Sequence, residues 1–196
     1  LLPASSEVLA EMEAQARQRD IPIVGPVVAR LFRLLAQTAG ARRVFELGSA
    51  IGYSTLWWAE AVGPQGEVYY TDNSRANAEE AAGYFRRAGC AERIRILTGE
   101  ALALLQATPG EFDIVFLDLN KEQYGAALDA AVPRLRLGGL LVADNVLWRG
   151  EAAQATPPEG AARHMAEFNR KLYGDARLEP VILPLRDGVA VARRMA

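Results

Sequence analysis

The order of short apolar segments and helical segments limits the fold of this chain more than any other feature. Strands joined through intervening helices form right-handed crossovers and lie parallel. Strands that are apolar throughout are expected where helices cover both faces of a sheet. We therefore predict a doubly wound, mostly parallel α/β sheet, whose first five strands are Arg43–Leu47, Glu67–Thr71, Arg93–Thr98, Phe112–Leu117 and Leu140–Ala143.

Helical patterns fill most of the remaining chain. Ser5 or Ser6 can cap a first helix that ends near Arg19. Pro26 stands near the start of a second helix, Val27–Thr38, where proline is tolerated. Further helices are predicted at Ser54–Val62, from Asn73 or Ser74 to near Gly89, and at Ala101–Gln106, Glu122–Leu135 and Ala161–Tyr173.

The C-terminal part departs from this alternation. Residues 149–160 read as a surface loop or a lid. Leu178–Leu183 and Val189–Ala192 then flank Asp187-Gly188, and Asp-Gly between apolar strands is a strong hairpin signal. We therefore predict a Rossmann-like, seven-stranded sheet with an antiparallel C-terminal hairpin. The length of 196 residues favours one domain, with helices in residues 1–40 and the core in residues 41–196.

Charge and composition argue against several classes of protein. The 22 basic and 24 acidic residues form no basic cluster, so we expect no nucleic-acid partner. No run of roughly 18 apolar residues and no signal-peptide pattern appear, so we expect a cytoplasmic protein without a membrane span. Cys90 and His164 are the only cysteine and histidine. This argues against a disulfide, a Cys/His zinc site and Ser/His/Asp catalysis, and Cys90 reads as a small buried residue.

The segment after the first strand has the character of a cofactor-binding turn. Gly48 and Gly52 let the backbone approach a ligand, and Asp72 ends the next strand 20 residues beyond Gly52, where it can bind a ribose. The spacing differs from the dinucleotide pattern, and Glu46 would repel a pyrophosphate. These features favour cationic S-adenosylmethionine over NAD, with a purely structural turn as the alternative. After the third strand, Gly99–Ala101 can offer backbone groups to an adenine.

Hard oxygen donors follow the next two strands. Asp118 ends the fourth strand, and Asp144-Asn145 end the fifth. Ligands of open α/β sheets bind outside these strand ends. Two carboxylates and an amide suit Mg²⁺, or another divalent cation such as Ca²⁺ or Mn²⁺, rather than zinc, and leave about three coordination positions open. Lys121 lies three residues past Asp118 and could act as a general base, with a salt bridge as the alternative role.

Three motifs make the chain resemble the cation-dependent small-molecule O-methyltransferases, the group that contains catechol and caffeoyl-CoA O-methyltransferases. The resemblance runs from about Ile21 to Arg194 and includes Leu185-x-Asp187-Gly188. The strongest motifs are Phe45-Glu46-Leu47-Gly48-x-x-x-Gly52-Tyr53-Ser54, Phe116-Leu117-Asp118-x-x-Lys121-x-x-Tyr124 and Asp144-Asn145-x-x-Trp148.

The resemblance implies a methyltransferase fold, a role for each candidate residue, a small phenolic acceptor and a homodimer. Lys121 would be the base, and Trp148 and Tyr124 would line the acceptor, with core aromatic residues as the alternative. A metal would be bound by Asp118, Asp144 and Asn145. S-adenosylmethionine would be bound by Glu46, Gly48, Ser49, Ser54, Asp72, Ala101 and Asp118, and by the backbone of Val24.

Two departures from the family pattern affect the acceptor site. Asn120 stands where many relatives carry a second acid beside the lysine, which would alter acceptor preference or the local charge. The segment before the first strand is about 42 residues long, so we expect a pocket that is open or completed by a partner subunit. The hypothesis is an enzyme that methylates one hydroxyl of a catechol-type molecule. The alternatives are a non-catalytic cofactor-binding scaffold and a metal-independent methyltransferase of RNA or protein.

Overall fold

The computed structural model describes residues 6–196, so Ser5 lies outside the described residues. Ser6 caps α1 (Glu7–Arg19) by accepting a hydrogen bond from Leu9 N at 3.4 Å. The other helices are α2 (Gly25–Thr38), α3 (Tyr53–Ala61), α4 (Arg75–Arg87), α5 (Ala101–Ala107), α6 (Tyr124–Ala131) and α7 (Ala161–Gly174). The strands are β1 (Arg43–Leu47), β2 (Glu67–Asp72), β3 (Ile94–Thr98), β4 (Phe112–Leu117), β5 (Leu135–Asp144), β6 (Leu178–Leu183) and β7 (Val189–Arg194). Short 3-10 turns are η1 (Ala91–Arg93), η2 (Lys121–Gln123), η3 (Val132–Arg134) and η4 (Glu151–Ala153).

The chain divides into two compact units, with the boundary between Leu104 and Leu105. The first unit holds β1 to β3 and α1 to α4, and the second holds β4 to β7, α6 and α7. The prediction of one domain over residues 1–196 is not tested by this division and stays a prediction.

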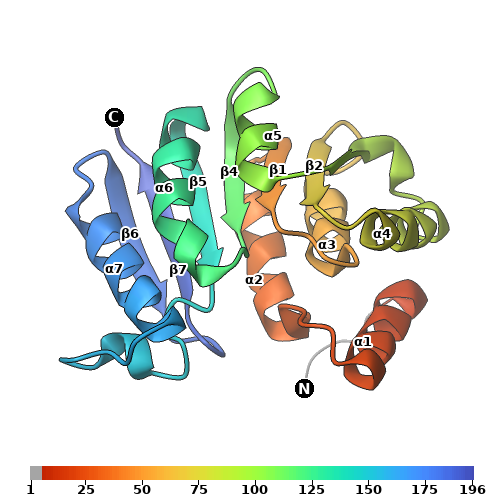
Figure 1. The fold of residues 1–196 in the computed structure, drawn as a ribbon. Coiled ribbons are helices and arrows are strands. Elements are labelled where there is room, and N and C mark those ends of the chain that lie inside the picture. Colours follow the sequence, from red (N-terminus) through yellow and green to blue (C-terminus); the bar gives the residue numbers. More distant parts are fainter. Residues whose placement is uncertain (1–5) are drawn as a thin grey trace. The chain divides into compact units, whose positions relative to one another are not determined.

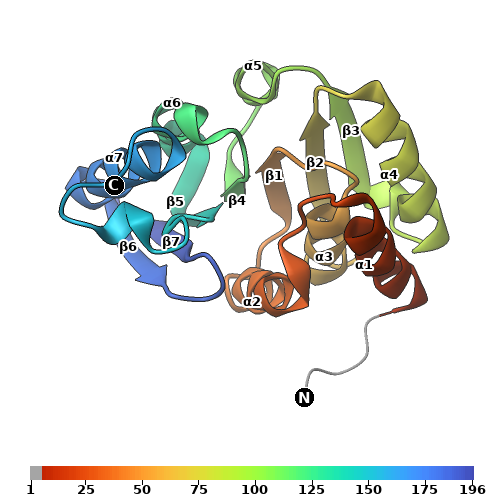
Figure 2. The same ribbon diagram turned by 60° about the horizontal axis from the view of Figure 1, so that its bottom comes forward.

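The first unit is built on parallel strands in the order β3-β2-β1 (Figure 2). Apolar positions pair across it, with Val68 opposite both Val44 and Ile94. Helices α2 and α3 pack together, and the ring of Phe32 stacks on Trp58 with 4.6 Å between centroids. These buried apolar residues give the glycine-rich turn after β1 a rigid support.

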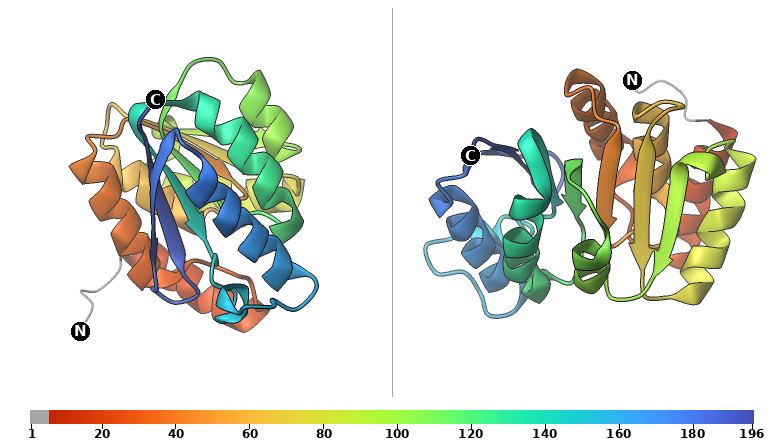
Figure 3. Two further views of the ribbon diagram at one scale, coloured as in Figure 1. Left: turned by 90° about the vertical axis from the view of Figure 1, so that its left-hand side faces the viewer. Right: turned by 90° about the horizontal axis from the view of Figure 1, so that it is seen from above.

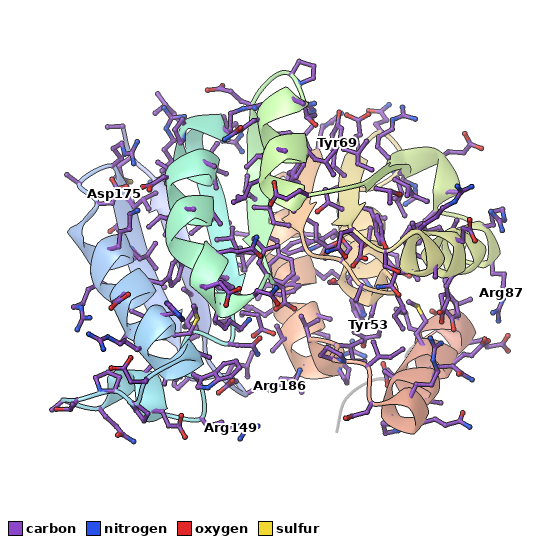
Figure 4. The ribbon with its side chains drawn as sticks, in the orientation of Figure 1. Tyr53, Tyr69, Arg87, Arg149, Asp175 and Arg186 are labelled. Carbon is purple, nitrogen blue, oxygen red and sulfur yellow. The ribbon has the colours of Figure 1, made fainter. Side chains whose placement is uncertain are left out.

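Helix α1 buries Leu9, Met12 and Ala16, and ion pairs on its surface add to its attachment to the first unit. Arg19 donates to both carboxylate oxygens of Glu80 at 2.6 and 3.0 Å. Arg87, which Figure 4 labels on α4, donates in the same way to Glu11. These pairs tie the N-terminal helix to α4.

The second unit has the strand order β4-β5-β7-β6 (Figure 1). β4 and β5 are parallel, whereas β7 is antiparallel to both of its neighbours. Helices α6 and α7 lie side by side over one face of these strands (Figures 1 and 3), and Tyr124 packs edge-on against Phe168 at 5.2 Å. Because Leu117 pairs with Ala143, the residues that follow them emerge at neighbouring strand ends.

The predicted fold class is confirmed. Residues 6–196 contain seven strands, mostly parallel, and the last two form the predicted antiparallel hairpin. β1, β4 and β6 have the predicted bounds. Cys90 is buried, as expected for a small apolar residue. Within this described range, no helix combines the length and the apolar character needed to cross a membrane.

The predicted helix Glu122–Leu135 is wrong in its C-terminal part. The α-helix ends at Ala131, η3 follows it, and Leu135 is the first residue of β5. Pro133 has no N–H group to donate, and its ring crowds the preceding turn. A regular helix therefore does not continue through this residue.

The predicted fifth strand, Leu140–Ala143, is too short. β5 begins at Leu135 and continues through Gly138-Gly139, where its register with β4 shifts. Gly138 has a φ of 74°, a left-handed conformation that glycine adopts at little cost. The glycine pair therefore marks a bulge inside one strand rather than the start of a new one.

Candidate functional site

The turn between β1 and α3 depends on its glycines. Gly48 and Gly52 have φ values of 87° and 85°, where residues with a side chain are strained. At Gly52 an added Cβ would also lie 2.6 Å from the ring of Phe85. Tyr70 stabilises the turn by donating a hydrogen bond to the carbonyl of Ala50 at 2.6 Å. The turn is thus held in one conformation.

Several backbone N–H groups of this turn are already used within the protein. Gly48 N donates to Thr71 Oγ1 at 3.3 Å, and Ser49 N donates to Thr71 O at 2.9 Å. Ala50 N donates to Asp72 Oδ2 at 3.1 Å. A pyrophosphate is usually bound through N–H groups of such a turn. Because these donors have protein acceptors, the turn fits a dinucleotide poorly.

Glu46 places a buried carboxyl group beside the turn. Its side chain is buried, and Oε2 accepts hydrogen bonds from Ser49 Oγ at 2.7 Å and from Thr55 Oγ1. Ser49 Oγ in turn accepts from Thr71 N at 3.1 Å. A buried carboxylate stabilised by hydroxyl donors suits a cationic ligand better than an anionic one.

Asp72 holds the turn and the start of α4 together. Besides its bond to Ala50, Oδ1 accepts hydrogen bonds from Ser74 N at 2.7 Å and from Asn77 Nδ2 at 3.2 Å. The carboxylate therefore sits in a defined position at the end of β2. Its predicted contact with a ribose stays a prediction.

The remaining predicted cofactor residues of the first unit lie near helix starts. Ser54 is in the first turn of α3, Ala101 begins α5, and Val24 directly precedes α2. All three are at most 7% exposed. Their contacts with a cofactor also stay predictions.

A second group of side chains lies at the ends of β4 and β5. Asp118 follows β4, and Asp144 ends β5 beside it. Asn145 has a left-handed φ of 61°, and its N–H donates to Asp144 Oδ1 at 2.9 Å. The two carboxylates and the amide predicted to bind a metal therefore come from adjacent strand ends of one unit.

Lys121 lies among these oxygens. Its Nζ donates to Tyr124 Oη at 2.8 Å, to Asn145 Oδ1 at 3.1 Å and to Asp118 Oδ1 at 3.4 Å. An ammonium has three N–H donors, so all three find acceptors here. The structure thus brings the predicted base into contact with two of the three predicted metal ligands.

Burial opposes ionisation of both carboxylates. Burial raises the pKa of Asp118, although the charges of Lys121 and Arg186 act to lower it. Burial, followed by the negative charge of Asp118, raises the pKa of Asp144 to about 7. Two neighbouring carboxylates that disfavour each other's charge are stabilised by a cation.

The chemistry of this oxygen set fits a hard divalent cation. Carboxylate and amide oxygens are ligands that Mg²⁺, Ca²⁺ and Mn²⁺ accept in proteins. Residues 6–196 show no metal-binding group of three or more His, Cys, Asp or Glu side chains. The candidate set has two acids only, Asp118 and Asp144, so the amide of Asn145 would have to supply the third protein oxygen.

The two predicted acceptor-lining aromatics differ in burial. Tyr124 is 0% exposed, and its Oη donates to the carbonyl of Asp144 at 3.0 Å while accepting from Lys121. It therefore positions the base. Trp148 is partly exposed, with its ring centroid 5.9 Å from Lys121 Nζ. Contact of either ring with an acceptor stays a prediction.

We name residues 145–149 and 184–188 the acceptor rim, after the acceptor that is predicted to bind beside them. Several residues there have a left-handed backbone conformation. This conformation is costly for residues with a side chain and is frequent at functional sites. Of the six non-glycine residues with positive φ in residues 6–196, four belong to the acceptor rim: Asn145 (61°), Trp148 (43°), Arg149 (57°) and Arg186 (52°).

Sequence reasoning missed Arg186 and Asp187 as site residues. Asp187 Oδ1 accepts a hydrogen bond from Arg149 N, and the hairpin turn lies beside the predicted metal ligands because Val189 pairs with Asp144. The hairpin itself was predicted. The motif Leu185-x-Asp187-Gly188 was the sequence signal that could have identified these residues. The register that brings the turn to the end of β5 is seen only in the structure.

Comparison with known proteins supports a family assignment. The family model described as O-methyltransferase matches residues 4–195. Tricin synthase 2 from Oryza sativa subsp. japonica is 31% identical, and the match covers 98% of this chain and 71% of that protein. Catechol O-methyltransferase from Mycobacterium tuberculosis is 37% identical over 76% of this chain and 67% of that protein.

Solved structures agree with this assignment. The O-methyltransferase TomG from Streptomyces achromogenes, involved in tomaymycin synthesis and solved with S-adenosylmethionine, has a TM-score of 0.91 and 28% identity, covering 100% of this chain and 93% of its own. Curated relatives also include proteins named caffeoyl-CoA O-methyltransferase, so the resemblance found in the sequence is confirmed. Membership of a family of enzymes sets aside the non-catalytic alternative. The chain belongs to the O-methyltransferase family.

Proposed function

We propose that this S-adenosylmethionine-dependent O-methyltransferase methylates one hydroxyl of a catechol-type small molecule with the help of a divalent cation. The observation that carries the proposal is the contact of Lys121 Nζ with oxygens of Asp118 and Asn145 at 3.4 and 3.1 Å. The side chain proposed as the base and the oxygens proposed as metal ligands thus belong to one cluster. A vicinal diol suits such a cluster, because it offers two oxygens to a cation and one proton to a base.

The first unit is proposed to hold the methyl donor. Glu46 contributes a buried carboxylate that suits a sulfonium-bearing ligand, and Asp72 contributes a positioned carboxylate for ribose hydroxyls. Gly48, Ser49, Ser54, Ala101 and the backbone of Val24 complete the proposed donor site in this unit. The predicted contact of Asp118 with S-adenosylmethionine stays a prediction.

The second unit is proposed to hold the acceptor. When bound, S-adenosylmethionine supplies an electrophilic methyl group, and a cation lowers the pKa of the acceptor hydroxyl. Asp118, Asp144 and Asn145 would hold the cation, and Lys121 Nζ, in its neutral amine form, would take the hydroxyl proton and become the ammonium. Tyr124 keeps Nζ in place by its 2.8 Å hydrogen bond.

The decisive experiment is an acceptor screen with S-adenosylmethionine, read by mass spectrometry. Catechol and 3,4-dihydroxybenzyl alcohol are expected to give mono-methylated product with Mg²⁺, whereas phenol gives none. EDTA is expected to abolish the product, and added Mg²⁺, Mn²⁺ or Ca²⁺ to restore it to different extents. Equal product with and without EDTA would reject the metal role and would favour the metal-independent alternative.

Two further expectations belong to this proposal. A homodimer is expected from the family resemblance, and size-exclusion chromatography with light scattering tests it. A cytoplasmic location is expected from the composition, and fractionation of the source cells tests that. A monomer in solution would leave the proposed chemistry standing and would reject only the expected assembly.

A further inference from the structure

The hairpin turn between β6 and β7 is fastened to the segment that carries the metal ligands. Val146 N donates to Gly188 O at 3.1 Å, and Leu147 N donates to Asp187 O at 2.9 Å. Arg149 N donates to the carboxylate of Asp187. Both segments of the acceptor rim are therefore held together by backbone-directed hydrogen bonds.

Close packing adds to this attachment. Gly188 has a φ of 86°, and a Cβ there would lie 2.5 Å from Leu147 Cγ. Asn169 on α7 donates to Val146 O at 2.8 Å. The position of Arg186, two residues before Gly188, is therefore set by the fold and not by a freely moving loop.

The acceptor rim carries positive charge next to the oxygen cluster. Arg149 and Arg186 are both exposed, and Figure 4 shows them at the same end of the second unit. The guanidinium charge of Arg186 acts on both Asp118 and Asp144. Because Val189 pairs with Asp144, the turn that carries Arg186 lies beside these strand ends, and its exposed side chain is available to a molecule bound there.

A catechol that presents its two hydroxyls to the oxygen cluster has its other ring substituents directed away from those hydroxyls. The acceptor rim is the charged surface beside that cluster. A guanidinium binds a carboxylate through two parallel hydrogen bonds, which makes arginine well suited to select an anionic substituent.

We propose that Arg186 is a specificity residue that selects catechol-type acceptors bearing a carboxylate on the ring or side chain. This inference rests on the proposed function, because it assumes that the acceptor binds at the cluster of Asp118, Asp144 and Asn145. The acceptor class would then be dihydroxybenzoates and dihydroxycinnamates, in preference to neutral or cationic catechols.

The test compares 3,4-dihydroxybenzoate with 3,4-dihydroxybenzyl alcohol, which has the same diol but no charge. The wild-type enzyme is expected to show a higher kcat/KM for the benzoate. Arg186→Gln is expected to lower that value about five- to tenfold, through KM, and to lower the value for the alcohol much less. Arg186→Lys keeps the charge and is expected to retain more of the preference than the Gln variant.

Arg177→Gln is the matched control. Arg177 directly precedes β6, whereas Arg186 follows it, so the two arginines lie at opposite ends of one strand. Arg177 pairs with Asp175 at 2.6 Å, and Figure 4 shows Asp175 far from Arg186. This variant removes the same charge and is expected to leave both substrates unaffected. Arg186→Gly, which accepts the φ of 52° without strain, repeats the test if the Gln variant folds poorly.

The outcomes separate the inference from the function on which it rests. The selection of anions would be overturned if the wild-type enzyme methylated both substrates with equal kcat/KM. Equal losses for both substrates in Arg186→Gln would overturn it as well. In both cases the methyltransferase activity stands. Equal losses would show that Arg186 acts only on the metal ligands. No product from any catechol would reject the proposed function and the inference with it. The inference is supported if Arg186→Gln loses the preference for the benzoate and Arg177→Gln keeps it.

Discussion

Tyr124 presents its hydroxyl to Lys121 at 2.8 Å while its ring centroid lies 4.6 Å from the same ammonium. The hydroxyl also donates to the carbonyl of Asp144 at 3.0 Å. One buried aromatic side chain therefore links the predicted base to the backbone of a predicted metal ligand. The base is positioned from inside the protein, by a residue that is 0% exposed.

We predict that Tyr124→Phe lowers kcat about tenfold or more and leaves the affinity for S-adenosylmethionine unchanged. The variant removes one of three acceptors of Lys121 and leaves a buried carbonyl without its donor, at a cost of about 1–3 kcal/mol. Steady-state kinetics and thermal denaturation measure the two effects. Tyr173→Phe, which changes a tyrosine that is 56% exposed, is the control. An unchanged kcat would show that Tyr124 does not position the base.

The stability of the metal-free protein should fall as the pH rises from about 4 to above 7. The folded-state pKa of Asp144 is raised from 3.8 to about 7, so the folded protein binds its proton more tightly than the unfolded chain. Ionisation across this window therefore destabilises the fold, by at most about 4 kcal/mol.

Asp144→Asn should flatten this pH dependence, because asparagine stays neutral. The measurement is denaturant unfolding in EDTA between pH 4 and 8. The control is Asp175→Asn, since a hydrogen bond from Arg177 lowers the pKa of that carboxyl instead. Parallel curves for the wild-type and Asp144→Asn proteins would contradict the prediction.

Gly52→Ala should destabilise the protein by about 2 kcal/mol or more. The new Cβ would lie 2.6 Å from the ring of Phe85, and a φ of 85° adds backbone strain. Gly83→Ala in α4 is the matched control, because nothing lies within 4 Å of its Cβ position and alanine favours a helix by about 0.5–1 kcal/mol. Differential scanning calorimetry should show opposite shifts in Tm, and equal shifts would refute the packing argument.

Glu46→Gln should weaken binding of S-adenosylmethionine more than binding of S-adenosylhomocysteine. The two ligands differ in the sulfonium charge. If the Glu46 carboxylate recognises this charge, the substitution should change the ratio of the two Kd values about tenfold. Isothermal titration calorimetry measures both. Glu79→Gln, on the exposed face of α4, serves as the control. Equal weakening of both ligands would assign Glu46 a purely structural role with Ser49 and Thr55.

Local sequence signals predicted much of the fold because the forces involved are local. Ser6 caps α1, and β1, β4 and β6 have the predicted bounds, since caps, apolar periodicity and turn residues act over a few positions. The C-terminal part of the helix predicted at Glu122–Leu135 was wrong. The apolar pattern continues past Pro133, but Leu135 already belongs to strand β5.

The sequence by itself determined the alternation of strands and helices, the glycine turn and the presence of Asp118, Lys121 and Asp144 at strand ends. Only the tertiary structure decided which of these side chains meet. Lys121 and Asn145 are 24 positions apart, yet they share a hydrogen bond because β4 and β5 are neighbours in register. The turn that carries Arg186 comes to lie beside the same cluster through the pairing of β7 with β5. Such contacts depend on strand order and register, which arise from packing of the whole unit and leave no short-range pattern in the chain.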